Sequence, residues 1–290
     1  MKRILLILSL STIHYSLIYA QSATRAERGT DSTLGRAFAP NLENSATHKL
    51  LLIPFYPNMC MSEIDKDVNG VNHEDFKHIT EDFRKALDLA MYSTIHQNYI
   101  TISLLQGKNK SDSVLNYVYG STGYNYDLVP GTDPDAVKSN DSVKKQHYIV
   151  KGQLQVPQDY SKRFMNVVIK NPKLLPYLYK RYHTDTFIFI NELDIKNVDN
   201  PTENLSEDTY RRLVTAHYSV LDKDGKTIVK GIATTYFPFG ENNPTEIGQK
   251  YFTVLARNIL KDYTTQLSAN LAKEQKKQGA TQPKGTATNH

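Results

Sequence analysis

Residues 186–195 constrain the fold most, because they read as a strand that is buried on both faces. They are Thr-Phe-Ile-Phe-Ile-Asn-Glu-Leu-Asp-Ile. The first half is continuously apolar, β-branched and aromatic, which is typical of a strand covered on both sides. In the second half, Leu193 and Ile195 point one way and Glu192 and Asp194 the other. We therefore expect a central strand in a sheet that helices cover.

The flanking segments predict an α/β fold with a mixed sheet of about five strands. Strands are expected at 49–55, 99–105 and 147–156, and residues 164–169 could be strand or helix. A helix is expected at 73–97, because Phe76, Ile79, Phe83 and Leu87 recur at three- and four-residue steps. A further helical turn begins at 171–172, and residues 58–72 read as a loop.

The last third of the chain predicts a hairpin and then a long helix. Two strand-like runs, 210–221 and 227–237, flank Asp222-Lys-Asp-Gly225, and Asp-Gly is a strong turn signal. Asn243, Pro244 and Glu246 suit the cap, first position and third position of a helix. This C-terminal amphipathic helix is expected to fray near Ala272.

The ends of the chain differ in composition from the part between them. Lys2 and Arg3 precede a short apolar run that leads to Ala20, which predicts a signal peptide over 1–20. An uncleaved membrane anchor is the alternative, but polar residues interrupt the run. We expect a flexible leader at 21–47, one α/β domain at 48–272 with an insertion at about 106–146, and a disordered basic tail at 273–290.

Charge and cysteine content exclude several classes of protein. The net charge is +5, and removal of Lys2 and Arg3 leaves +3 (5 − 2), so no nucleic-acid partner is expected. Cys60 is the single cysteine, so an internal disulfide is excluded. It could be a nucleophile, an intermolecular bridge or a small buried side chain. Position 21 is Gln, not the cysteine that a lipid anchor requires. We expect a periplasmic or secreted protein without stable membrane insertion.

Two groups of residues are candidates for binding. The insertion carries four tyrosines that could form a contact surface or pack locally, since tyrosine offers a large area at low entropic cost: Tyr117, Tyr119, Tyr124 and Tyr126. Asp65, Asp67 and Asn69, followed by Gly70, match the first half of a calcium-binding loop. The glutamate at position 12 of that loop is missing, so a polar turn is the alternative reading. Calcium is the only cofactor that the sequence suggests.

No catalytic residue is assigned, because no nucleophile motif has its required context. Glu192 and Asp194 could form an acidic site or face solvent. A pocket that held His183 or His217 beside a carboxylate would favour an enzyme. The expected helix-cap role of His183 is the alternative.

Three stretches have the sequence pattern of a known group of domains. They are Leu-Leu-Ile-Pro-Phe at 51–55, the strand at 185–195, and the hairpin Tyr-Ser-Val-Leu-Asp-Lys-Asp-Gly-Lys-Thr-Ile-Val at 218–229. Together they resemble the α/β domain shared by the TolB N-terminal region, the curli secretion protein CsgG and the lipoprotein activators of peptidoglycan synthases. The resemblance covers roughly residues 49–271 without the insertion. The lipidating cysteine and the TolB β-propeller are absent.

The resemblance implies an α/β fold and a periplasmic, non-catalytic role, and it implies no particular partner. The leading hypothesis is a non-enzymatic protein that binds another cell-envelope component through a sheet edge, the tyrosine-bearing insertion or both, with a role in envelope assembly or secretion. The partner would be an envelope protein or a peptidoglycan-associated one. Two alternatives remain: a secreted hydrolase whose active site has no sequence motif, and a calcium-binding structural module.

Overall fold

The computed structural model describes residues 48–129, 131, 148–150, 153–155, 163–198 and 211–280. They belong to the unit that begins at residue 43. The expected signal peptide, leader and most of the tail lie outside the described residues. No helix within the described ranges is long and apolar enough to cross a membrane.

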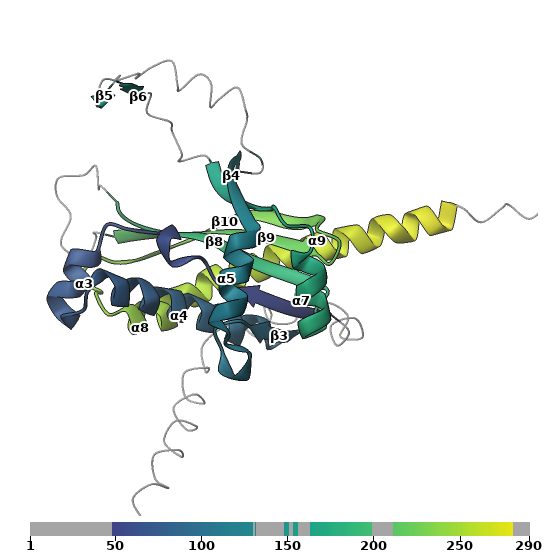
Figure 1. Cartoon of the computed structure of the whole chain (residues 1–290), viewed down its shortest axis with the longest axis horizontal. Helices are drawn as coiled ribbons and strands as arrows, with labels where there is room; N and C mark the ends of the chain where they lie inside the picture. The colour runs from purple at the N-terminus through teal and green to yellow at the C-terminus, as the bar shows by residue number, and fades with distance from the viewer. Residues whose placement is uncertain are drawn as a thin grey trace, which may run out of the picture. The chain divides into compact units, whose positions relative to one another are not determined.

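A mixed sheet forms the centre of the molecule and confirms the predicted α/β class (Figure 1). Its strand order is β10 (Thr227–Pro238), β9 (Arg211–Asp222), β8 (Thr186–Asn197), β1 (Lys49–Ile53) and β3 (Ile100–Ser103), and the short β2 (Cys60–Ser62) also pairs with β8. Strand β1 is parallel to β3 and β8, while β8, β9 and β10 form an antiparallel meander. The predicted central strand is β8.

The expected division of side chains along β8 depends on a bulge. Ile188 and Ile190 face one side of the sheet, as do Leu193 and Ile195. Strict alternation would place residues 190 and 193 on opposite sides. The register against β9 shifts between Ile190 and Glu192, so Asn191 is the extra residue that restores the apolar side.

One face of the sheet is covered by α4 (Phe76–Ile95) and by the C-terminal helical segment. That segment consists of α8 (Pro244–Ile247), the π-helical η4 (Gly248–Phe252) and α9 (Thr253–Ala280). Asn243 caps it as predicted, because its side chain accepts from Thr245 and Glu246 N–H. The helix continues to Ala280, beyond the expected fraying point. Phe76, expected on the buried face of α4, is exposed in its first turn.

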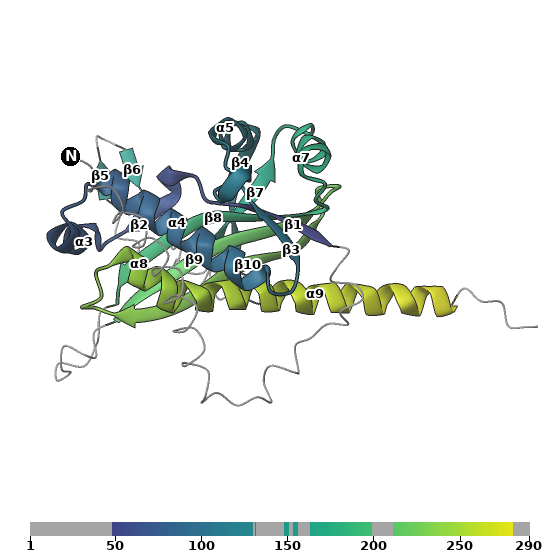
Figure 2. The same ribbon diagram turned by 90° about the horizontal axis from the view of Figure 1, so that it is seen from below.

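The other face is covered by α5 (Asp112–Ser121), α7 (Leu174–Tyr182) and the paired strands β4 (Thr122–Leu128) and β7 (Arg163–Ile169). Figure 2 shows α5 and α7 on the opposite side of the sheet from α9. Val114, Leu115 and Val118 of α5 are buried in this second core. Residues 112–128 were expected in an insertion but belong to the packed domain, and most of 130–147 lies outside the described residues.

Two local predictions are wrong. Residues 58–72 are not a loop, because they contain η1 (Pro57–Met59), β2 and the helix α3 (Asp65–Asn72). Residues 147–156 are not one strand, because β5 (Tyr148–Val150) and β6 (Gln153–Gln155) pair antiparallel with each other. A short turn (η2, Gly107–Asn109) follows β3.

Candidate functional site

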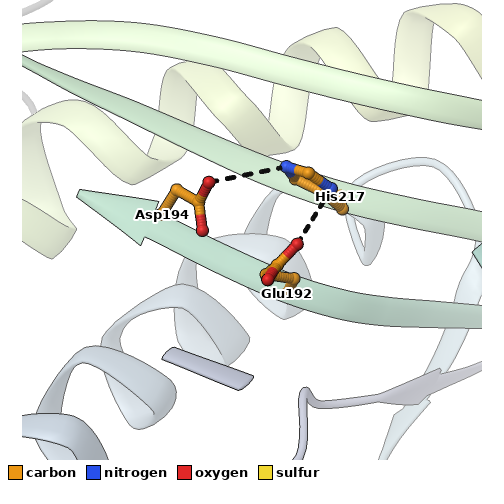
Figure 3. Close-up of side chains that lie close together, drawn as sticks. All are labelled: Glu192, Asp194 and His217. Atoms are coloured by element: carbon orange, nitrogen blue, oxygen red, sulfur yellow. Dashed lines mark ion pairs between the residues drawn. The ribbon is translucent and has the colours of Figure 1, made fainter. Parts of the chain in front are cut away.

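Two acidic side chains and a histidine meet on the face of the sheet that β4 and β7 cover (Figure 3). We call Glu192, Asp194 and His217 the acid–histidine cluster. Glu192 and Asp194 come from β8 after the bulge, and the β8–β9 register places His217 opposite Glu192. His217 Nδ1 lies 3.2 Å from Glu192 Oε2, and Nε2 lies 3.9 Å from Asp194 Oδ2. The side chains of Glu192 and His217 are each 6 % exposed.

Burial changes the protonation of this cluster. Loss of hydration raises the pKa of Glu192 to about 7, with a further contribution from the charge of Asp194. Loss of hydration also lowers the pKa of His217 to about 4, against the opposing influence of Asp194. Both side chains are therefore neutral in mildly acidic solution. Asp194 forms an ion pair with Lys196, with 3.2 Å between Oδ2 and Nζ, but Asp194 Oδ1 is buried without a hydrogen bond.

Side chains of the sheet, including His217 of the cluster, form hydrogen bonds with backbone groups of β7. Met165 N–H donates to His217 Nδ1 at 2.8 Å, and Val167 N–H donates to Ser219 Oγ at 3.3 Å. Asn191, the bulge residue, donates to Met165 C=O at 2.8 Å. Side chains of the sheet thus take the place of a neighbouring strand. A buried backbone group without a partner would be costly, so these polar residues stabilise the docking of β7.

The cluster does not fit a metal ion with β7 in this position. His217 Nδ1 accepts the Met165 hydrogen bond, so neutral His217 carries its proton on Nε2. A metal ion needs a nitrogen lone pair, and Nε2 then has none to offer. If the proton moved to Nδ1, two N–H donors would face each other, one from His217 and one from Met165.

The cluster also gives little support to a hydrolase. His217 does lie beside a carboxylate, as an enzyme would require. However, its Nδ1 is already occupied, and neither side chain has the exposure that a substrate would need. The nearby Ser219 donates to Asn166. Burial raises the pKa of Cys60 to about 12, so this thiol stays protonated and unreactive. His183 lies apart, at the left-handed C-cap of α7.

A second region is an open cleft of about 370 Å³, which we call the tyrosine cleft. Its lining comes from the segment after β1, from α5 and from β4: Tyr56, Met59, Asn116, Tyr119, Gly120 and Tyr124. The rings of Tyr56 and Tyr119 lie 4.9 Å apart between centroids. None of the lining side chains is charged.

Tyr119 is held rigidly at the base of the cleft. Its hydroxyl accepts from Arg84 Nη2 at 2.8 Å and donates to Pro54 C=O at 2.9 Å. Burial raises the pKa of this hydroxyl well above its ordinary value, so it stays protonated. Arg84 in turn pairs with Glu81 at 3.1 Å, which offsets its charge. The ring is therefore fixed before any ligand arrives.

The structure separates the four tyrosines that the sequence grouped. Tyr119 and Tyr124 line the cleft. Tyr117 accepts from Asn171 and packs edge-on against Tyr177 of α7. Tyr126 donates to both carboxylate oxygens of Glu192, at 3.0 and 3.2 Å. Sequence reasoning did not identify Tyr56 or Asn116 as members of the cleft, because only the fold brings the segment after β1 against α5.

The predicted calcium ligands lie on α3, and their oxygen atoms do not converge. Asp67 points to a different side of α3 from Asp65 and Asn69, which are four residues apart and share a side. Asp67 pairs with the buried Arg212, and the Asn69 amide donates to Glu74 C=O. Asp65 Oδ1 is buried without a partner. Calcium binding at these residues stays a prediction that this geometry does not favour.

Comparisons with known proteins identify no family. Neither a protein-family model nor a curated protein matches the chain. One solved structure, lipoprotein GNA1162 from Neisseria meningitidis, is 14 % identical, with 70 % of this chain and 91 % of that chain covered. Its TM-score is 0.26, which is too low to support a conclusion about fold or function.

Proposed function

We propose that this chain is a non-enzymatic periplasmic or secreted protein that binds another cell-envelope component through the tyrosine cleft. The observation that carries the proposal is the cleft itself, an open site lined by three tyrosines and no charged side chain. The signal-peptide pattern of residues 1–20 and the resemblance to TolB-like domains support an envelope location. Both remain predictions.

The cleft has the physical properties of a recognition site. Its volume of about 370 Å³ lies within the range of small ligand pockets. Tyrosine rings bury a large area and lose few rotamers on binding. Tyr119 is already fixed by Arg84 and the Pro54 carbonyl, so little ordering remains to oppose binding.

The partner chemistry follows from the lining. Aromatic rings and the Met59 thioether favour apolar or aromatic side chains, while the exposed Asn116 offers one amide for a backbone hydrogen bond. No lining residue offers a charge to pair with a charged ligand. We therefore propose that the cleft binds an uncharged segment of another envelope protein.

The test is site-specific photo-crosslinking in cells, with the probe at position 116 on the rim of the cleft. Tyr179 is 48 % exposed on α7 and lines none of the cleft, so position 179 is the control. We expect a discrete adduct from position 116 alone. The crosslinked peptide of the partner should be uncharged and, when synthesised, should bind the purified protein.

A second variant blocks the cleft without disturbing the fold. A side chain at Gly120 would meet no atom within 4 Å, so Gly120→Leu is expected to project into the cleft. It should abolish the adduct and peptide binding, while the control Tyr179→Ala leaves both unchanged. Equal adducts from both positions, a purely glycan adduct, or full binding by Gly120→Leu would each reject the proposal.

A further inference from the structure

The strands β4 and β7 form a two-stranded layer that contacts the sheet through titratable side chains. β7 is held by the hydrogen bond from Met165 N–H to His217 Nδ1. β4 is held by Tyr126, whose hydroxyl donates to Glu192. Tyr126 and Met165 lie opposite each other in the β4–β7 pair. One titratable pair, Glu192 and His217, therefore supports both strands at the same point.

The proton positions in this pair are mutually dependent. Nδ1 of neutral His217 has one in-plane lone pair, which Met165 N–H already uses. Glu192 Oε2 lies 3.2 Å from the same nitrogen. A protonated carboxyl tolerates that arrangement, because it brings no negative charge toward the nitrogen. A carboxylate does not, because two electron-rich atoms would then face each other in a buried site.

Ionised Glu192 should draw the imidazole proton to Nδ1. On Nε2 that proton makes no hydrogen bond to Asp194, because Asp194 Oδ2 is 3.9 Å away. With hydrogen on Nδ1, His217 donates to Glu192 and can no longer accept from Met165. The Met165 N–H would then be buried without a partner, which disfavours the docked position of β7.

The same strand layer reaches the tyrosine cleft. Tyr124 lines the cleft, and Tyr126 follows two residues later on the same side of β4. A change in how β4 and β7 dock would therefore move one wall of the cleft.

We propose that Glu192 is a proton switch: its protonated form keeps His217 in the tautomer that docks β7, and its ionised form releases β7 and weakens binding at the tyrosine cleft. The last step rests on the function proposed above, whereas the tautomer and docking steps do not.

The surrounding charges are compatible with a switch near neutral pH. The packed elements contribute these titratable or charged groups: Asp194 and Lys196 on β8, Tyr126 and Asp127 on β4, Arg163 on β7, Lys230 on β10 and Cys60 on β2. Lys230 offsets Asp127 at 2.7 Å. The pKa of Glu192, about 7, places its ionisation between pH 6 and 8.

The first experiment follows the free protein by NMR, with no partner present. The nitrogen shifts of His217 report which ring atom carries the proton. We expect the Nε2–H tautomer at pH 5.5 and a growing Nδ1–H population above pH 7. After correction for intrinsic rates, the exchange protection of the Met165 amide should fall about tenfold between pH 5.5 and 8.

The matched variant is Glu192→Gln, which keeps the shape and the neutral form. Its Met165 protection should not change over this pH range. A single His217 tautomer throughout in the wild type, or an equal pH response in Glu192→Gln, would overturn the switch.

A second readout separates the switch from the proposed function. The affinity of the synthetic partner peptide should fall between pH 6 and 8 in the wild type and stay constant in Glu192→Gln. If Met165 responds but the affinity does not, the link to the cleft is overturned. Failure of the peptide to bind at any pH would instead reject the proposed function.

Discussion

Strand β4 joins the two regions, because Tyr124 lines the tyrosine cleft and Tyr126 contacts the acid–histidine cluster, yet the two regions use their polar groups in opposite ways. In the cluster, Glu192 and His217 are almost fully buried; Glu192 accepts from Tyr126 of β4, and His217 accepts from the Met165 N–H of β7. In the cleft, Tyr56 and Asn116 are exposed, and the hydroxyl of Tyr119 donates to the Pro54 carbonyl. A dense group of titratable residues can therefore serve the fold, while the proposed binding site is a neutral, open surface.

The largest expected effect is the loss of the His217 acceptor. His217→Leu leaves the buried Met165 N–H without its acceptor and removes the imidazole beside Glu192, which should lower the free energy of unfolding by about 3 kcal/mol. Tyr56→Ala in the cleft should cost no more than about 1 kcal/mol, because that ring is partly exposed. Urea unfolding at pH 7 measures both. Similar costs would show that the cleft is part of the core.

The next effect concerns the dependence of stability on pH. Between pH 4 and 6.5, folded His217 binds fewer protons than the unfolded chain, so its contribution to stability rises with pH. Between pH 4.5 and 7, folded Glu192 binds more protons, so its contribution falls as pH rises. Over pH 4.5–6.5 the two slopes oppose each other, and we expect them to cancel for this pair.

Single variants should reveal each slope. Glu192→Gln should gain stability as pH rises from 4 to 6.5, and His217→Gln should lose stability from 4.5 to 7, each by up to about 3 kcal/mol. The free energy of unfolding is measured with urea across this range. Subtracting the values of the Glu192→Gln, His217→Gln double variant removes the contributions of all other titratable groups. Parallel curves for the two single variants would contradict the assigned protonation states.

Sequence reasoning found the sheet but not the cluster, and the bulge explains why. The apolar run of β8 and the Asp224-Gly225 turn predicted the strand and the hairpin. Which β9 residue faces Glu192 depends on the register, and the extra residue Asn191 changes it by one. The signal was present in the sequence as the three-residue step from Ile190 to Leu193. A strand with unbroken alternation would have placed those two side chains on opposite faces.

For the four tyrosines, the sequence predicted the segment but not the role of each side chain. Their spacing indicated a polar, aromatic segment, and α5 and β4 do carry them. Their separate roles depend on long-range neighbours such as Arg84, Glu192 and Tyr177. The α3 helix was missed because Asp, Asn and Gly are typical of turns. Tertiary contacts, including the Asp67–Arg212 pair, stabilise a helix there instead.

A smaller effect distinguishes two tyrosines on one strand. The hydrogen bond from Tyr126 lowers the pKa of Glu192, so Tyr126→Phe should raise that pKa further and cost about 1 kcal/mol of stability. Tyr124→Phe should leave the pKa of Glu192 unchanged, because Tyr124 belongs to the cleft. The carboxyl carbon shift of Glu192 during a pH titration measures both. Equal shifts would mean that the two regions are not electrostatically separate.

The smallest effect is expected at Gly120, and Gly248 is the helical glycine to compare it with. An added methyl group at Gly120 meets no atom within 4 Å, so Gly120→Ala should stabilise the protein by roughly 0.5 kcal/mol through helix propensity. At Gly248 the same methyl group would lie 2.5 Å from the Ala86 Cβ, where η4 crosses α4. Gly248→Ala should therefore destabilise by about 2 kcal/mol. Thermal unfolding of both variants tests the contrast. A destabilised Gly120→Ala would show that the space beside α5 is filled in solution, and that the cleft is not open to a partner.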